Sequence, residues 1–226
     1  MSEKPPEFSE APKIEATETK TEEEVLSEAI EDLKVRLRPF VENSKGRRRG
    51  LYSRHYKELY TYRDATIEKF PEMAEFITAM VESFCAHAEW YILNTHLVVT
   101  HGNNPEMLTQ YWDFLQWMGM NKTHIIGARC HAGAYHIFEE LGLHPQLPTA
   151  FQDAWEKTDL IVQGKPVQVK SASLAESDFI ADLAEEKDGS LLIYINAYRL
   201  SQITAQPEQE VLDLVKKQIE ERNIRF

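Results

Sequence analysis

The chain has 226 residues, of which 42% are hydrophobic and 27% are charged, as in an ordinary soluble globular protein. No apolar run approaches the roughly 18–20 residues of a membrane-spanning helix, and the acidic start MSEKPPEFSE lacks the apolar core of a secretory signal. The two cysteines, Cys85 and Cys130, give no disulfide framework, so we expect a reduced, cytoplasmic protein.

The formal net charge of −12 is unevenly distributed along the chain. Residues 1–32 hold 11 acidic and 3 basic residues, whereas residues 34–63 hold 10 basic and 2 acidic residues. A local positive field matters more to a polyanion than the net charge of the whole chain. The acidic total therefore does not exclude a nucleic-acid partner, although it disfavours tight non-specific binding.

The first part of the chain combines an acidic tail with a helix signal. Residues 1–21 contain three prolines, many glutamates and few large apolar groups, so we expect a disordered acidic tail. Thr21 and the three glutamates after it predict a helix that ends near residues 41–43. We predict a helical region over residues 22–122 and an α/β core over residues 123–226.

The basic segment 34–63 contains the loop SKGRRRG and the sequence LYSRHYKELYTYR. Arginines can contact phosphates and tyrosines can stack on bases, so the segment is a candidate nucleic-acid contact. The alternative is a solvated loop followed by an amphipathic helix whose tyrosines pack inward. The candidate nucleic-acid-binding residues are Arg47, Arg48, Arg49, Arg54 and Lys57.

Three further helices are predicted by their apolar spacing and their ends. A long helix opens at a proline and covers residues 71–93, and a second, with an asparagine cap before its proline, covers residues 104–118. A third covers residues 123–141, with Gly142 as its terminator and a thin glycine- and alanine-rich side that suits close packing. The aromatic-rich helices at 71–120 are expected to cap the core or to form a homodimer face.

The C-terminal part is predicted to hold a hairpin, a short helix, a strand and a last helix. Residues 158–171, TDLIVQGKPVQVKS, fit two short strands with a turn at residues 163–165. The acidic stretch after the hairpin predicts a short helix that ends near Gly189. Residues 191–197, LLIYINA, are typical of a strand, and Pro207 opens the last helix.

The hairpin carries three polar side chains that can act together. Because side chains alternate along a strand, Gln168 and Lys170 share one face, and Asp159 joins them if it points to the same side. A carboxylate is a hard ligand for Mg²⁺, and an amide can add an oxygen or orient a water. An ammonium group can position a water and stabilise the charge that develops at phosphorus.

The pattern Thr158-Asp159, then eight residues, then Gln168-Val169-Lys170 resembles the core motif of the PD-(D/E)XK nuclease superfamily, in the branch with glutamine at the acidic position. The resemblance covers about residues 123–225. It implies an α/β (α+β) fold with a restriction-endonuclease-like core. It also implies an endonuclease that hydrolyses DNA with Mg²⁺ or Mn²⁺. Asp159 and Gln168 would then hold the metal, and Lys170 would act beside them in catalysis.

The chain departs from the family pattern in three ways. Thr158 replaces the proline, and Gln168 replaces the acidic residue and removes one charge from the metal site. The family often carries a glutamate on the helix before the hairpin, and here that place falls near His131, which could ligate a metal or bind phosphate. The acids that could compensate are Asp153, Glu156 and Glu139.

Three alternatives stay open. The hairpin could be structural, with an ion pair between Asp159 and Lys170, or the fold could be a catalytically degraded nuclease that binds nucleic acid or protein. Zinc held by Cys85–His87 and Cys130-His131 is the least favoured, because both pairs fall inside predicted helices. If Asp159 and Lys170 point to opposite faces, or if no second acid lies within roughly 5–6 Å of Asp159, the enzyme hypothesis loses most of its support.

Overall fold

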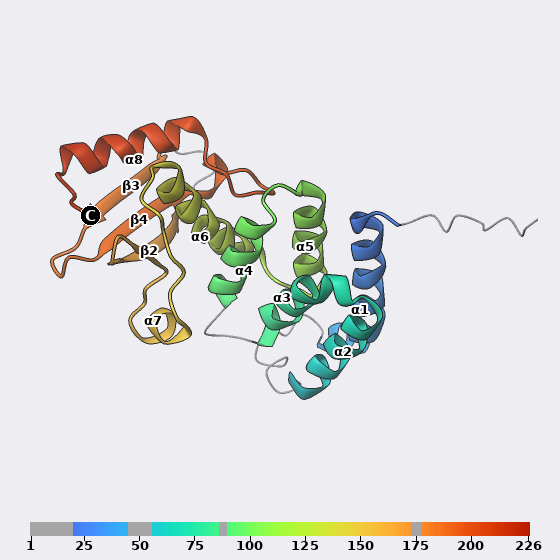
Figure 1. Cartoon of the computed structure of the whole chain (residues 1–226). Helices are drawn as coiled ribbons and strands as arrows, with labels where there is room; N and C mark the ends of the chain where they lie inside the picture. The colour runs from blue at the N-terminus through green and yellow to red at the C-terminus, as the bar shows by residue number, and fades with distance from the viewer. Residues whose placement is uncertain (1–19, 45–55, 86–89, 173–177) are drawn as a thin grey trace, which may run out of the picture.

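The computed structural model describes residues 20–44, 56–85, 90–172 and 178–226. In these ranges the chain forms eight α-helices and a four-stranded sheet (Figure 1). The helices are α1 (Glu22–Ser44), α2 (Tyr56–Lys69), α3 (Ala74–Cys85), α4 (Trp90–Thr100), α5 (Pro105–Trp117), α6 (Lys122–Glu140), α7 (Ala150–Trp155) and α8 (Gln209–Glu221). The strands are β1 (Leu160–Val162), β2 (Lys165–Ala172), β3 (Ala181–Glu185) and β4 (Leu191–Asn196), and the 3₁₀ helices are η2 (Pro71–Met73) and η3 (Ala197–Arg199). Most of the tail expected to be disordered and most of the basic loop lie outside the described residues.

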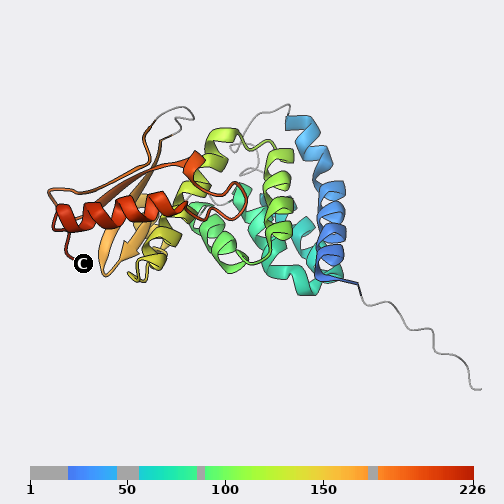
Figure 2. The same ribbon diagram turned by 90° about the horizontal axis from the view of Figure 1, so that it is seen from above.

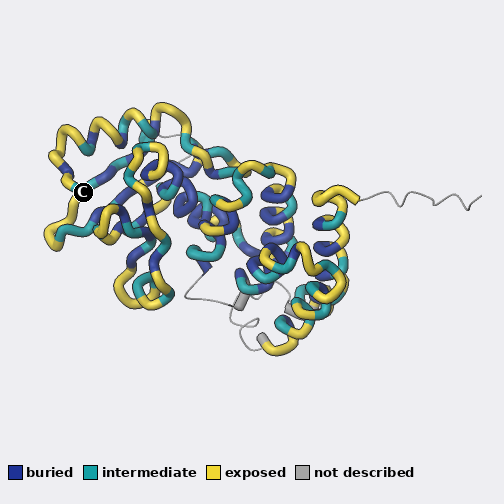
Figure 3. The backbone as a smooth tube through the Cα atoms, viewed as in Figure 1, coloured by how far each residue is buried: buried dark blue, intermediate teal, exposed yellow. Residues whose placement is uncertain are grey.

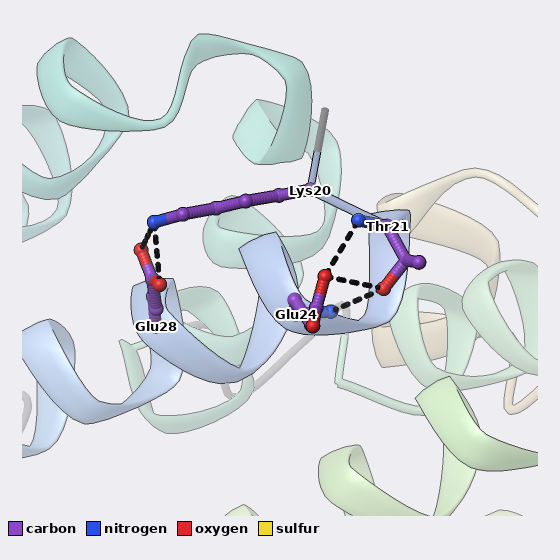
Figure 4. Close-up of polar contacts among 4 residues, drawn as sticks. All are labelled: Lys20, Thr21, Glu24 and Glu28. Atoms are coloured by element: carbon purple, nitrogen blue, oxygen red, sulfur yellow. Dashed lines mark hydrogen bonds and ion pairs between the residues drawn. The ribbon is translucent and has the colours of Figure 1, made fainter. Parts of the chain in front are cut away.

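Helix α1 begins at the predicted residue, with a reciprocal cap. The N–H of Glu24 donates to Oγ1 of Thr21 at 3.3 Å, and the N–H of Thr21 donates to the Glu24 carboxylate at 2.8 Å (Figure 4). The Lys20 ammonium lies 2.6 Å from the Glu28 carboxylate one turn further on. The cap satisfies two backbone donors that a helix end would otherwise leave open.

The prediction of one long helix over residues 71–93 is wrong. Residues 71–73 form η2, and α3 and α4 are separate helices that pack against each other, while residues 86–89 lie outside the described residues. Leu97 and Val98 of α4 are buried, and so are its polar residues Asn94 and Thr95. A helix that is buried on several sides carries no single apolar stripe, so spacing alone did not separate it from α3.

Helix α6 joins two apolar clusters, as its thin side suggested. One cluster unites α1 to α5 and takes Ile125, Ala128 and Ala132 from α6. The other lies between the sheet, α6 and α8, and takes Ala134 and Ile137, among others, from α6. The helix ends as predicted at Gly142 (φ 72°), whose N–H donates to the carbonyl of residue 139 at 2.9 Å. A residue in the left-handed region here stops a helix while its last carbonyls keep partners.

The sheet has the strand order β1-β2-β4-β3, with β2 and β4 parallel and the other two pairs antiparallel. The short acidic helix predicted before Gly189 is wrong, because residues 181–185 form β3 at the edge of the sheet. Ala181 and Leu183 are buried, and the N–H of Leu183 donates to the amide oxygen of Gln218 on α8 at 2.8 Å. The segment is therefore a strand because it pairs with β4 and contacts α8, although its local composition favours a helix.

The sheet has one covered and one open face. Alternate residues of β2 and β4, such as Val169 and Ile193, are buried in the cluster shared with α6 and α8, whereas Lys170 and Tyr194 on the other face are exposed. Most of α6 is buried in the interior of the molecule, and much of α8 is exposed (Figure 3). The sheet lies at one end of the molecule, and α1 and α2 lie at the other end (Figures 1 and 2). Among the described residues we find no helix with the length and hydrophobicity of a membrane span.

Candidate functional site

The predicted hairpin is present, with a tighter turn than expected. Leu160 pairs with Val167 and Val162 pairs with Lys165, so the turn consists of two residues, Gln163 and Gly164, rather than three. Both have positive φ, at 50° and 82°. This backbone is the type I′ turn, whose twist matches that of the flanking strands, and glycine at the second position makes it accessible.

Asp159 lies at the foot of the hairpin, one residue before β1. Its N–H donates to the carbonyl of Val167 at 2.8 Å, and its Oδ2 accepts the N–H of Val169 at 2.6 Å. The side chain therefore takes the place of a backbone acceptor on the β2 edge beyond the end of β1. Both bonds go to β2, the strand that carries Gln168 and Lys170, and the last residue pair of the β1–β2 ladder is Leu160 with Val167.

His131 on α6 is brought to the same place. Its Nε2 lies 3.9 Å from Oδ1 of Asp159, and both side chains are nearly buried, at 8% and 13% exposed. The imidazole stacks on the ring of Tyr91 from α4, with centroids 4.1 Å apart and planes 9° apart. Tyr91 passes directly over Gly127 of α6, where a β-carbon would lie 2.8 Å from the tyrosine hydroxyl. The histidine ring thus has neighbours from α4 (Tyr91) and from the foot of the hairpin (Asp159).

The two buried groups have shifted pKa values. Burial raises the pKa of Asp159 from 3.8 to about 6, against the opposing effects of the Val169 N–H and the Lys170 ammonium. Burial lowers the pKa of His131 to about 3, and the charge of Lys170 acts in the same direction. At neutral pH the imidazole is uncharged and the carboxylate is mostly ionised.

Lys170 and Gln168 lie on the open face of β2, as the alternation predicted. Lys170 is exposed and Gln168 is half-buried, whereas their neighbour Val169 is buried. Lys170 is close enough to influence the pKa values of Asp159 and His131, yet among the described residues no ion pair joins Lys170 to Asp159. The ion-paired structural hairpin that the sequence left open is therefore not what the structure forms.

Of the three side chains that the sequence offers as metal ligands, the structure brings together the carboxylate of Asp159 and the imidazole of His131, while Gln168 lies half-buried on β2. Within the described ranges no three His, Cys, Asp or Glu side chains converge on a point, so Glu139, Glu156 and Asp153 do not complete a carboxylate site. Mg²⁺ is often held by one or two carboxylates together with substrate phosphates and water. One oxygen of Asp159 accepts the Val169 N–H, and a single carboxylate of this kind could serve only that weak, substrate-assisted mode; a neutral imidazole such as that of His131 suits Mn²⁺ or another transition ion better than Mg²⁺.

The cysteine-based zinc alternative receives no support. The Cys130 thiol is buried and lies 3.7 Å from the carbonyl oxygen of Ile195, so it faces the sheet. Burial raises the pKa of Cys130 to about 12. A zinc ligand must be a thiolate, which this environment disfavours. The side chain of Cys85 and the whole of His87 lie outside the described residues.

The basic segment is only partly described. Arg47, Arg48, Arg49 and Arg54 lie outside the described residues, and Lys57 is exposed on α2. Three other basic residues of the segment are paired with acids: Lys34 with Glu31 (2.7 Å), Arg36 with Asp32 (2.6 Å) and Arg63 with Asp64 (2.7 Å). Helices α1 and α2 lie at the opposite end of the molecule from the sheet (Figures 1 and 2). The described part of the segment is therefore not a neighbour of Asp159.

Sequence reasoning missed two aromatic features, one in contact with the site and one just before Asp159 in the sequence. One is Tyr91, read only as part of a helix stripe. The other is the pair Phe151 and Trp155 on α7, which are 61% and 77% exposed and stack with centroids 6.4 Å apart. The capping box formed by Thr149 and Gln152, followed by aromatics four residues apart just before Asp159, was the available signal.

Comparisons with known proteins add no relative. No protein-family model, no curated protein and no solved structure matches the chain. The class of the protein therefore has to be argued from the hairpin and its neighbours.

Proposed function

We propose that the chain is a nuclease of the PD-(D/E)XK type, with a restriction-endonuclease-like core, that hydrolyses phosphodiester bonds with a divalent metal. The observation that carries the proposal is the approach of His131 to Asp159 at 3.9 Å, at the foot of the strand with Gln168 and Lys170. Counted back from Gly142, this histidine falls near the helix position where the family often has a glutamate. The structure thus brings the helix residue to Asp159, and Lys170 is near enough to influence the pKa values of both.

Each group would have a distinct task. Asp159 and Gln168 would hold the metal, with His131 as a further ligand, and the metal would supply charge neutralisation at the phosphate and a more acidic water. Lys170, on the open face, would contact the phosphate and stabilise the charge that develops on it. Asp159 would keep one oxygen on the Val169 N–H, which fixes its orientation, and would present the other.

The exposed ring pair of α7 favours a substrate with unpaired bases. Phe151 and Trp155 precede Asp159 by a few residues, and their rings offer surfaces on which bases can stack. Stacking of a base on an aromatic ring contributes about 1–3 kcal/mol and tolerates any sequence. We therefore expect single-stranded DNA, or duplex ends and flaps, to be cleaved in preference to blunt duplex DNA.

Purified protein incubated with plasmid, linear duplex, single-stranded DNA and RNA in Mg²⁺ or Mn²⁺ tests the proposal. Asp159→Asn and Lys170→Ala are expected to reduce cleavage at least about 100-fold, in line with the loss of a metal ligand or a charge-stabilising group. Lys165→Ala is the matched control, because Lys165 is on the same strand but at its other end, paired with Glu185. If the Lys170→Ala variant still cleaves DNA at the wild-type rate, the assignment of the active site to Asp159, Gln168 and Lys170 is refuted.

A second candidate is a nuclease fold that binds nucleic acid without cleaving it. It is favoured by the single carboxylate at the site and by the raised pKa of Asp159, both of which weaken metal binding. It predicts single-strand affinity that falls in Trp155→Ala, is unchanged in Asp159→Asn, and is accompanied by no metal-dependent turnover in the wild type. Fluorescence anisotropy with a labelled oligonucleotide separates the two candidates.

A further inference from the structure

A cavity lies on the side of α6 that faces away from His131. It has a volume of about 480 Å³ and sits between the end of α5, the first turns of α6 and the loop after η3. Its lining residues are Gln116, Met120, Lys122, Ile125, Ile126, Arg129 and Gln202. Arg129 and His131 are two residues apart, which is about 200° around a helix, so the cavity and the Asp159 site lie on different faces of α6.

The lining has an unusual charge balance. It contains two basic side chains, two amides and three apolar side chains, and no acid. Within the described ranges, neither Lys122 nor Arg129 forms an ion pair with a carboxylate. In a chain with 37 acidic and 25 basic residues, a cavity with only positive charges is not explained by composition.

Arg129 is held in place without neutralisation of its charge. Nη1 donates to the amide oxygen of Gln202, and the guanidinium carbon lies 5.5 Å from the centre of the Trp112 ring. Gln202 in turn donates to the carbonyl of Leu200 at 3.4 Å, which directs its oxygen toward the arginine. Nε of Arg129 is buried and has no hydrogen-bond partner in the part of the chain that the structure describes. Burial lowers the pKa of Arg129, which means that the charged form is partly desolvated.

We propose that this cavity binds a small organic anion, whose carboxylate or phosphate group contacts Arg129 and Lys122 and whose body packs on Met120 and Ile125. A partly buried guanidinium is stabilised by an oxyanion, and arginine is the side chain whose geometry suits that partner best. The volume matches ligands of ordinary metabolite size. The flanking amides can bond the polar atoms of the ligand, and the apolar wall covers the rest.

Three variants test the site, and two more serve as controls. Arg129→Gln and Lys122→Gln each remove one positive charge. Lys216→Gln, which removes the charge of an exposed lysine on α8, is the charge-matched control. Gln116→Glu places a carboxylate in the cavity lining, where it can pair with Arg129 and compete with the ligand. Gln110→Glu, on α5 but outside the lining, is the control for the added negative charge.

The probes are benzoate, phenyl phosphate and neutral benzyl alcohol, titrated by NMR and by thermal shift in a buffer free of other organic anions. We expect at least one anion to bind with a Kd of about 1 mM or lower and benzyl alcohol not to bind; the stronger anion identifies the head group. Arg129→Gln and Lys122→Gln should weaken that binding about tenfold or more. Gln116→Glu should raise the melting temperature of the free protein and abolish anion binding.

Three results would overturn the assignment. They are the absence of binding by either anion, equal binding of benzyl alcohol, and anion binding that is unchanged in Arg129→Gln or Gln116→Glu. If Arg129→Gln fails to fold, Lys122→Gln and Gln116→Glu still decide, because neither removes the contact with Trp112. Nuclease activity is not measured, so the outcome is independent of the function proposed for the Asp159 site.

Discussion

Replacement of Asp159 by asparagine should stabilise the protein at alkaline pH. The carboxyl group has a raised pKa, about 6 against 3.8, because burial disfavours its charge. Below pH 3.8 it is protonated in the folded and the unfolded chain and has little effect on stability. As the pH rises, the unfolded chain ionises first and the folded protein later, so stability falls between about pH 4 and pH 6 and stays lower above that range.

The magnitude follows from the two pKa values. Their difference of about two corresponds to roughly 3 kcal/mol, since a tenfold change in proton affinity is about 1.4 kcal/mol. The side chain is 13% exposed, and residual water contact reduces the effect, so we expect about 1–3 kcal/mol. Asparagine keeps an oxygen that can accept the Val169 N–H, so the substitution removes the charge but not the hydrogen bond.

Urea unfolding in EDTA, at about pH 4.5, 6 and 8, measures the effect as the difference in the free energy of unfolding between variant and wild type. The difference should grow with pH and level off above about pH 7. Asp113→Asn, at an exposed position on α5, is the matched control and should show no such trend. A variant that is less stable than the wild type at pH 8, or a difference that does not change with pH, would refute the reasoning.

Three other predictions concern stability and reactivity. Burial raises the pKa of Asp32, but hydrogen bonds from Arg36, Lys69 and Thr66 outweigh this effect and hold the pKa at about 2. The carboxylate therefore stabilises the fold above pH 3.8, and this stabilisation is lost as the pH falls toward 2. Asp32→Asn should reduce the free energy of unfolding by about 1–2 kcal/mol at pH 7 and by less near pH 3, measured by urea unfolding. Gly127→Ala should reduce stability by about 1 kcal/mol in urea unfolding, because the clash with Tyr91 exceeds the gain in helix propensity. In a Cys85→Ser background, Cys130 should react with a thiol reagent only after unfolding, because it is buried and its pKa is raised to about 12; rapid labelling of the native protein would contradict this.

The elements that the sequence predicted well are those with local signals. The start of α1, the asparagine cap of α5, the glycine end of α6 and the hairpin all have a residue whose chemistry marks the boundary, and all are present. The two predictions that were wrong concern segments without such a boundary residue. Strand β3 is acidic and short, and it exists because β4 and Gln218 supply its partners from elsewhere in the chain. The break between α3 and α4 is hidden because α4 is buried on more than one side.

The candidate site shows the same division between local and long-range information. The alternation along β2 predicted the faces of Gln168 and Lys170 correctly, because it depends only on strand geometry. Counting back along the helix placed the family's glutamate position near His131, and the structure has Nε2 of His131 at 3.9 Å from Oδ1 of Asp159. Tyr91, which stacks on the imidazole, comes from α4, and no pattern in the sequence links the two segments.

The energetics of the site are the strongest physical argument that it is functional. A buried carboxyl with a raised pKa and a buried imidazole with a lowered pKa both reduce stability relative to apolar residues of similar size. Asp159 provides one structural bond, to the Val169 N–H, and an asparagine could provide it without the charge. Among the described residues, the imidazole of His131 makes no hydrogen bond to the backbone that would explain why it is buried. Two buried groups that lower the free energy of unfolding and are not required by the fold are expected where a bound ligand restores that free energy. The metal and phosphate proposed for this site would do so.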